Sequence, residues 1–129
     1  MTHKQPKRNP RPGIDEYGRT TLHNAVIDKD LARTQAALDA GADVNATDDD
    51  GWTALHFAAQ DHSVAIGDML LRAGAAVDPQ DSNGNTPLWT AVMNAHGQQF
   101  IDLLTEHGAD PFIKNFYDVS PHDIESDSE

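Results

Sequence analysis

Two short segments recur along the 129-residue chain at a nearly constant interval, and this repetition restricts the fold more than any other feature. The first segment recurs with a period of about 33 residues, as GRTTLHNAV from Gly18, GWTALHFAA from Gly51 and GNTPLWTAV from Gly84. The second follows it each time, with glycines at Gly41, Gly74 and Gly108, and its last interval is longer by one residue. A weak fourth copy, DVSPHDI, begins at Asp118. A period of this length indicates stacked units, each too small to bury its apolar face alone.

Each unit reads as a helix, a tight turn, a second helix and a projecting hairpin loop. A threonine at the start of the first helix accepts hydrogen bonds from backbone N–H groups that lack partners within the helix. In the third unit Pro87 follows this threonine, where its missing N–H is not needed. We expect Gly41, Gly74 and Gly108 to end the second helices in the left-handed conformation. One extra residue near the segment NAHG predicts a longer turn in the third unit.

The recurring segments resemble the ankyrin repeat, whose motif is T-P-L-H-x-A in a unit of about 33 residues. The matching residues are Thr20, Leu22, His23 and Ala25, then Thr53, Leu55, His56 and Ala58, then Thr86, Pro87, Leu88 and Ala91. The resemblance covers residues 14–125 and implies an all-α solenoid of helix–turn–helix units with projecting β-hairpin loops. Three full repeats are expected, at about 15–47, 48–80 and 81–114, with a partial fourth at 115–125.

The histidine of this motif recurs with the repeat, as a structural residue must and a catalytic residue has no reason to. In the ankyrin family it links neighbouring repeats through hydrogen bonds to their loops, so the resemblance implies this role for His23 and His56. Trp89 takes the position in the third repeat, where we expect a bulky packing residue. In the fourth copy His122 and Asp123 replace the Leu-His pair.

We predict no catalytic residue, no cofactor and no metal site among the remaining polar residues. The segment DDDG at 48–51 is similar to a calcium loop, but Ala46 and Phe57 would then occupy positions that require oxygen ligands. His56 and His62 are six residues apart, whereas two ligands on one helix face are four apart. The chain has no cysteine, which excludes disulfides and thiolate zinc sites.

The charge distribution favours a basic protein as the partner. The formal net charge is −12, and all 21 Asp and Glu residues lie beyond residue 12. Four of the nine Lys and Arg residues precede that point, so the repeats hold only five. Such a field repels phosphate backbones, which disfavours nucleic acid, and it speeds encounter with a basic protein. The alternative interpretation is a surface that serves solubility alone.

Both ends of the chain are expected to be tails. Residues 1–13 read as a basic, disordered tail without an apolar stretch, so we predict no export signal, no membrane contact and a cytoplasmic location. Residues 126–129 read as an acidic tail, and the segment ESDSE is expected to be disordered.

The two ends of the stack need different caps. Arg33 stands where the later repeats have Ile66 and Phe100, as suits a first unit with no neighbour before it. At the other end, the aromatic segment FIKNFY at 112–117 is expected to cover apolar residues of the third repeat: Phe100, Ile101 and Leu104. A monomer is favoured, and a dimer through this end is the alternative.

In ankyrin proteins, partners usually dock on the concave side, formed by the hairpin tips and the inner helices. Mapping by position within the repeat predicts these partner-binding residues: Glu16, Tyr17, Arg19, Asp28, Asp49, Asp50, Trp52, Gln60, Asp61, Asn83, Asn85, Met93, Asn94 and Tyr117. Trp52 is expected to be an exposed anchor, and the alternative is that it lies against the next hairpin. Asp48–Asp50 form either a solvated turn or a docking point for Lys or Arg.

These expectations describe a non-catalytic interaction module, similar to short, free-standing ankyrin proteins of bacteria. It is expected to bind a basic protein through its concave face and hairpin tips. Two alternatives remain open: an immunity-type inhibitor of a basic toxin or nuclease, and an assembly role through the C-terminal end.

Overall fold

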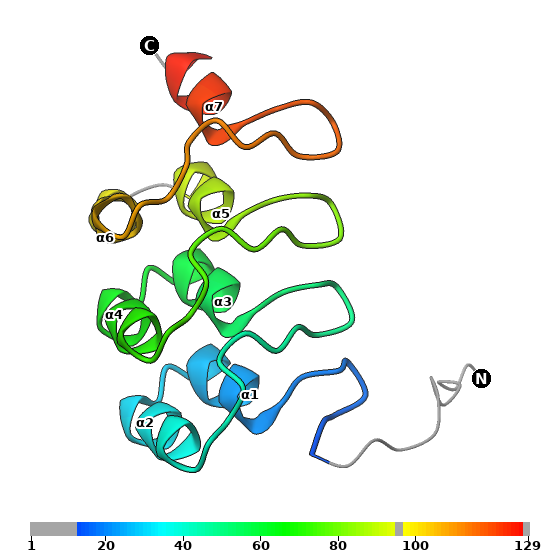
Figure 1. Ribbon diagram of the computed structural model, residues 1–129, viewed down its shortest axis with the longest axis vertical. Coiled ribbons are helices and arrows are strands. Elements are labelled where there is room, and N and C mark those ends of the chain that lie inside the picture. The colour runs from blue at the N-terminus through cyan, green and yellow to red at the C-terminus, as the bar shows by residue number, and fades with distance from the viewer. Residues whose placement is uncertain (1–12, 95–96, 128–129) are drawn as a thin grey trace, which may run out of the picture.

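Seven helices make up the regular structure in the computed structural model, which describes residues 13–94 and 97–127. They are α1 (Thr21–Ile27), α2 (Leu31–Asp39), α3 (Ala54–Gln60), α4 (Val64–Arg72), α5 (Pro87–Met93), α6 (Gln98–Glu106) and α7 (Pro121–Asp127). Figure 1 shows α1, α3, α5 and α7 in one row, α2, α4 and α6 in a second row, and the loops projecting away from the second row. This arrangement confirms the predicted solenoid of three full repeats and a partial fourth. Residues 1–12, most of the predicted basic tail, lie outside the described residues.

The helix boundaries follow from the capping residues of the repeat. Thr20, Thr53 and Thr86 have extended backbones, and each hydroxyl accepts the N–H of the residue three positions later. At the other ends, the φ angles of Gly41, Gly74 and Gly108 are 90°, 95° and 88°, the left-handed conformation that was predicted. Three residues separate the two helices in the first and second repeats and four do so in the third, which confirms the longer turn.

The core lies between the helices of each repeat and between neighbouring repeats. Leu22, Leu55 and Leu88 stand one period apart and are all buried. Phe100 is fully buried on α6, and its ring packs on α4 at Gly67, where a Cβ would lie only 2.6 Å from the ring. Arg33, at the equivalent position of the first repeat, is exposed and pairs with Asp28 at 2.9 Å. The first unit therefore has the polar outer position that was predicted for it.

The C-terminal end differs from two expectations. Phe112, Phe116 and Tyr117 are 62%, 70% and 72% exposed, so the segment at 112–117 does not provide an aromatic cover for α6. Phe100 does not need this cover, because its ring packs against α4 of the preceding repeat. The expectation of disorder for the segment ESDSE is also wrong in part, because α7 continues through Asp127.

The projecting loops are joined to one another through their backbones. The N–H groups of Asp49, Ser82 and Phe116 each donate to a carbonyl of the preceding loop at 3.0 Å. Within residues 13–94 and 97–127 the only β pairing is an isolated bridge between Ile14 and Thr20, so the loops are hairpin-shaped turns without strand ladders.

One glycine in each of the first three loops permits this close stacking. Gly51 has a φ angle of 78°, and a Cβ there would lie 2.9 Å from the backbone nitrogen of Ser82 in the next loop. Gly84 is in the same position against Phe116. The fourth loop has Asp118 at this position, with a φ angle of 67°. Because no further loop packs on it among the described residues, a Cβ is tolerated there.

In the segments that follow α2 and α4, one side chain per repeat also joins neighbouring repeats. Asn45 Oδ1 accepts the N–H of Ala76 at 2.8 Å, and Asp78, one period later, accepts the N–H of Asp110 at 3.1 Å. Partial burial raises the pKa of Asp78, and the nearby Asp110 carboxylate raises it further. The ionised form of Asp78 is therefore less favourable in the folded chain than in the unfolded chain.

We expect Asp78→Asn to raise the free energy of unfolding at pH 7 by about 0.3–1 kcal/mol, because asparagine keeps the acceptor without the charge. A raised carboxyl pKa costs stability as the pH rises through the ordinary value of 3.8 toward the folded value. The gain should consequently disappear near pH 3, where Asp78 is protonated in both states. Urea unfolding at the two pH values measures it, and a gain of equal size at pH 3 would contradict this explanation.

Candidate partner-binding surface

The predicted partner-binding residues lie on the loops and on the inner helices. Nine of the fourteen are exposed: Glu16, Tyr17, Asp28, Asp49, Asp50, Gln60, Asn83, Met93 and Tyr117. The other five are half-buried: Arg19, Trp52, Asp61, Asn85 and Asn94. Asp28 is partly neutralised, because its carboxylate pairs with Arg33.

A pocket of about 290 Å³ opens between the second and third repeats. Its lining consists of Trp52, Gln60, Asp81, Asn83, Asn85, Trp89, Thr90, Met93 and Asn94. Six of the predicted partner-binding residues are among these nine, so the structure brings that part of the predicted surface together. The other eight predicted residues lie outside the pocket.

The pocket exists because the third repeat has a small residue where the second has a large one. Phe57 and Thr90 occupy equivalent positions, one period apart on α3 and α5. Between the first and second repeats, the Phe57 ring lies 5.3 Å below the Arg19 guanidinium and 4.8 Å from the Trp52 ring. Between the second and third repeats, Thr90 supplies no ring, and the corresponding space is open.

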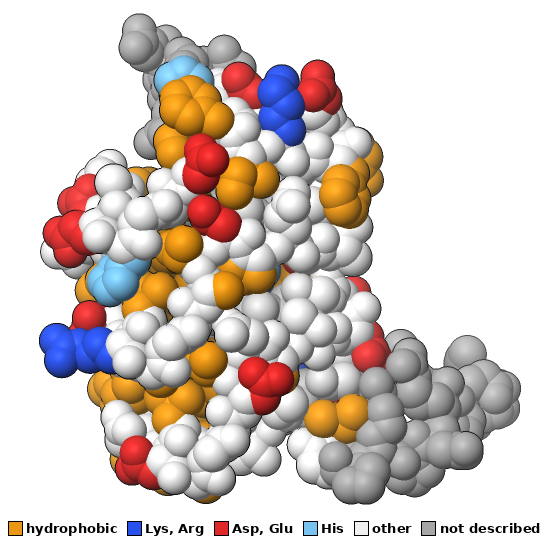
Figure 2. Space-filling model, in the orientation of Figure 1, with side chains coloured by type: hydrophobic (Ala, Val, Ile, Leu, Met, Phe, Trp, Pro, Cys, Tyr) orange, Lys and Arg blue, Asp and Glu red, His pale blue; other side chains and the backbone are white. Residues whose placement is uncertain are grey.

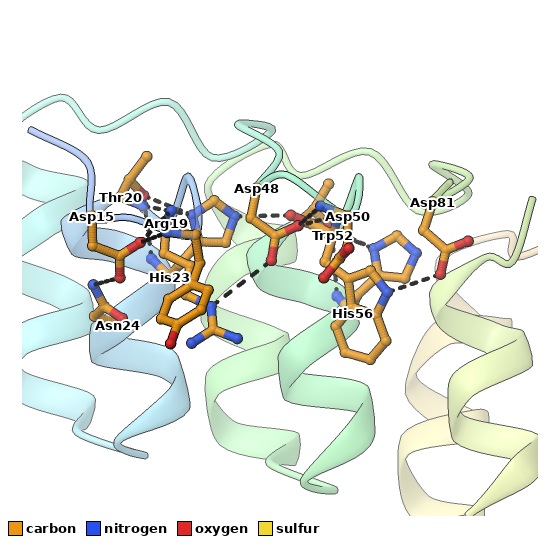
Figure 3. A network of polar contacts seen from close by, with 12 residues as sticks. Asp15, Arg19, Thr20, His23, Asn24, Asp48, Asp50, Trp52, His56 and Asp81 are labelled. Atoms are coloured by element: carbon orange, nitrogen blue, oxygen red, sulfur yellow. Dashed lines mark hydrogen bonds and ion pairs between the residues drawn. The ribbon is translucent and has the colours of Figure 1, made fainter. Parts of the chain in front are cut away.

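Trp52 is positioned by the next loop (Figure 3). Its indole Nε1 donates to Asp81 Oδ2 at 2.9 Å, and the ring stacks on His56 with 5.4 Å between centroids. Trp52 is thus half-buried and packs against the next hairpin, as the alternative expected, while its role as a partner anchor stays a prediction. The remaining exposed part of the ring lines the pocket.

Arg19 also belongs to the internal packing more than to the free surface. Its guanidinium carbon lies 4.9 Å from the Tyr17 ring centroid, and its Nε is 3.9 Å from Asp48 Oδ2. The side chain is half-buried against these groups, which leaves little of it for a partner. Its role in partner binding stays a prediction.

His23 and His56 link consecutive repeats (Figure 3). In each ring Nδ1 accepts the N–H of the capping threonine, at 3.0 Å from Thr20 and 3.1 Å from Thr53. The proton of the neutral ring is therefore on Nε2, which donates to a carbonyl of the next loop at 2.9 Å. Those carbonyls belong to Trp52 and Asn85. The contacts are the ones the resemblance implied.

Burial lowers the pKa of His56, because the imidazolium form would lose its hydration. The Asn85 carbonyl and the carboxylates of Asp81 and Asp48 act in the opposite direction and are outweighed. The neutral ring can accept at Nδ1 and donate at Nε2, whereas a protonated ring would lose the first of these bonds. The pKa shift thus favours the form that the hydrogen bonds require.

Trp89 leaves the third repeat without an equivalent histidine bond. The Val119 carbonyl, which matches those of Trp52 and Asn85, still accepts the N–H of Asn115 within its own loop at 2.9 Å. Trp89 is half-buried and forms one wall of the pocket. Its role as a packing residue stays a prediction.

Sequence reasoning missed the residues that shape the loops: Asp15, Asp48, Asp81 and Asn115, which we call the loop-start residues. One side-chain oxygen of each accepts the two N–H groups that lie two and four positions later, at 2.8–3.1 Å. Asp48 is buried, so it is neither a solvated turn residue nor a docking point. For the three aspartates the signal is present in the sequence as a D-x-x-G pattern, once in each full repeat.

Three of the loop-start residues, Asp48, Asp81 and Asn115, also contact a side chain of the preceding loop. Arg19 pairs with Asp48, Trp52 donates to Asp81, and Asn115 Nδ2 donates to Asn85 Oδ1 at 2.9 Å. Each loop is thus held to the next by one backbone bond and one side-chain contact. This rigid spacing fixes the distance between the two walls of the pocket.

The described residues meet the requirements of neither a metal cluster nor a membrane-spanning helix. Residues 13–94 and 97–127 contain no cluster of three or more His, Asp or Glu side chains suited to a metal ion. Within the same ranges, no helix has the length and apolar character needed to cross a bilayer.

Comparison with known proteins agrees with the observed fold. No curated protein matched the chain. The family model described as ankyrin repeats, in three copies, matches residues 22–115, from α1 to the start of the fourth loop. Ankyrin repeats generally serve as protein–protein interaction modules. The matched segment spans most of the chain and the helix pairs recur at its period, so the protein belongs to the ankyrin-repeat family.

Proposed function

We propose that the chain binds a basic protein through its loop tips and its inner helices α1, α3 and α5. The observation that carries this proposal is the pocket between the second and third repeats, which sits beside loops rich in acidic side chains. The pocket supplies aromatic rings and amides for close contact. The acidic residues supply long-range attraction for a positively charged surface.

The charge of the surface supports a basic partner. Glu16, Asp49 and Asp50 are exposed on the first two loops. Acidic side chains outnumber basic ones on the face shown in Figure 2. A partner with complementary charge would approach the loops faster than a neutral one, and charged groups at a rim act mainly on the association rate. An immunity-type inhibitor of a basic toxin or nuclease is one specific form of this function.

Assembly through the C-terminal end is the second candidate, and one observation favours it. Phe112, Phe116 and Tyr117 are all more than half exposed on the last loop and the segment before it. Large apolar side chains exposed at the end of the stack are candidates for contact with another chain. Sedimentation velocity of the Phe112→Ser, Phe116→Ser double variant tests it. A dimer in the natural chain that dissociates in the variant would support assembly, and a monomer in both would reject it.

The test of the main proposal is a set of three neutral substitutions in the second repeat. Asp49→Asn, Asp50→Asn and Asp61→Asn together should slow association with a partner captured from the native host by about fivefold or more at low ionic strength. The dissociation rate should change less, because the pocket remains intact. Stopped-flow kinetics measures both rates.

A matched control removes the same charge from the outer helices. Asp39→Asn, Asp102→Asn and Glu106→Gln lie on α2 and α6, in the row away from the loops, and all three residues are exposed. This control should alter the association rate by less than about twofold. Equal slowing by both triple variants would mean that only overall charge matters, and the loop surface would lose its assigned role.

A further inference from the structure

The pocket is the counterpart of a space that the Phe57 ring fills one repeat earlier. Between the first and second repeats, the Arg19 guanidinium lies over Tyr17 and Phe57 and beside the buried Asp48 carboxylate. One period later, Asp81 takes the place of Asp48 and Thr90 takes the place of Phe57. Trp52 takes the place of Arg19 and donates to Asp81. The carboxylate is thus retained, an indole replaces the cation beside it, and the space of the Phe57 ring is open.

The open space is lined by groups that suit a planar cation. Trp52 and Trp89 present aromatic surface, and a guanidinium stacks well on such rings. Asn94 Nδ2 donates to the Thr90 carbonyl at 2.8 Å, so this amide has its oxygen left to accept a hydrogen bond. Guanidinium has five N–H donors and no acceptor, which matches a lining rich in side-chain carbonyls. Ligand pockets for whole small molecules occupy about 300–1,000 Å³, so a pocket at the lower limit suits one long side chain.

The electrostatics of the pocket favour a positive guest. Asp81 is only 5% exposed and accepts hydrogen bonds from Trp52 Nε1 and from the N–H groups of Asn83 and Asn85. Asp48, one repeat earlier, has Arg19 within 3.9 Å. In the described part of the chain, no Lys or Arg forms an ion pair with Asp81. Trp52 occupies the position beside Asp81 that Arg19 has beside Asp48, so the hydrogen bonds of Asp81 are satisfied while its charge is not neutralised. This negative charge in the pocket lining attracts a cation in the space next to it.

We propose that the pocket binds the side chain of one exposed arginine from the partner, stacked on Trp52 and Trp89 and hydrogen-bonded to the surrounding amides. This inference rests on the proposed function and adds the residue type that the partner inserts. Arginine fits better than lysine, because the ammonium group is compact, strongly hydrated and unable to stack as a plane.

The two tryptophans are the only ones in the chain, so their indole N–H signals report on the pocket directly. The experiment titrates the full ¹⁵N-labelled chain with acetyl-Ala-Arg-Ala-amide and follows both indole cross-peaks. We expect saturable shifts in the millimolar range. The citrulline peptide, which has the same shape without the charge, should bind at least tenfold more weakly. The lysine peptide should bind several-fold more weakly than the arginine peptide.

A substitution that copies a residue of the second repeat into the third tests where the arginine side chain binds. Thr90→Phe places in the third repeat the ring that the second repeat has at Phe57, and it should reduce peptide affinity at least tenfold. Thr105→Phe adds the same ring at an exposed position of α6 and should leave affinity unchanged. If Thr90→Phe does not fold, Trp89→His restores the residue found at His23 and His56 and should reduce affinity several-fold.

Two results would overturn this assignment. The first is the absence of a saturable indole shift with the arginine peptide, and the second is equal affinity for the arginine and citrulline peptides. Either result leaves the proposed function intact if the captured partner still associates more slowly with the Asp49, Asp50 and Asp61 triple variant. Conversely, arginine binding that persists while both charge variants associate alike would reject the acidic loop surface and retain the pocket.

Discussion

Phe100→Ala is expected to lower the free energy of unfolding by about 3–5 kcal/mol. The ring is fully buried on α6 and packs on α4 where Gly67 leaves room for it. Alanine would leave a cavity at the junction of the second and third repeats, and the surrounding helices would collapse around it only in part. Urea unfolding followed by circular dichroism measures the loss.

Phe112→Ala is the control for this prediction. Its ring is 62% exposed, with its centroid 4.7 Å from that of His122, and its removal should change the free energy of unfolding by less than about 0.5 kcal/mol. If Phe100→Ala cost less than about 1 kcal/mol, the junction between α4 and α6 would not depend on this ring.

His56→Ala is expected to cost at least about 2 kcal/mol. The side chain is fully buried, and its removal leaves the Thr53 N–H without its acceptor and the Asn85 carbonyl without its inter-repeat donor. Partner binding by the folded variant should be nearly unchanged, because the ring is inaccessible. Normal stability combined with lost binding would contradict the structural role.

The pH dependence of the free energy of unfolding provides a second test of the structural role of His56. Because the pKa of His56 is lowered in the folded chain, the unfolded chain binds a proton first as the pH falls. The contribution of His56 is therefore present above its ordinary pKa of 6.5 and is lost as the pH falls through that value toward the folded pKa. The natural chain should lose more stability than His56→Ala between pH 7.5 and pH 5. Parallel losses would place the titrating group elsewhere.

Features that are local in the sequence were predictable. The capping threonines, the left-handed glycines and the longer turn of the third repeat depend on a few adjacent residues and on the period. The roles of His23 and His56 followed from the family motif because their partners recur with the repeat.

Features that depend on contacts between repeats were harder to predict. Trp52 and Arg19 occupy equivalent positions on exposed loops, but each side chain turns toward the loop-start residue of the next repeat. Nothing in a single repeat specifies that direction. The pocket likewise results from a difference between Phe57 and Thr90 that has meaning only when the two repeats are superimposed. The direction of Phe100 toward α4 was not predicted for the same reason.

The sequence therefore predicted the location of the candidate surface better than it predicted the individual residues that form it. Six of the predicted residues meet in one pocket, while the buried Asp81 in its lining was not predicted. Its recurrence with Asp15 and Asp48 is visible in the sequence, but acidic residues in loops ordinarily indicate solvated turns, because a buried aspartate is unusual unless its acceptors are satisfied. The backbone N–H groups that satisfy it become evident only in the folded loop.

The most direct test of a basic partner is the dependence of its association rate on salt. Stopped-flow mixing with the captured partner, between about 0.02 M and 1 M NaCl, spans screening lengths from above 10 Å down to about 3 Å. The acidic loops predict an association rate that falls steeply over this range, a dissociation rate that changes little, and a shallower fall for the Asp49, Asp50 and Asp61 triple variant. An association rate that is flat across the whole range would contradict the proposal and leave the acidic surface a role in solubility alone.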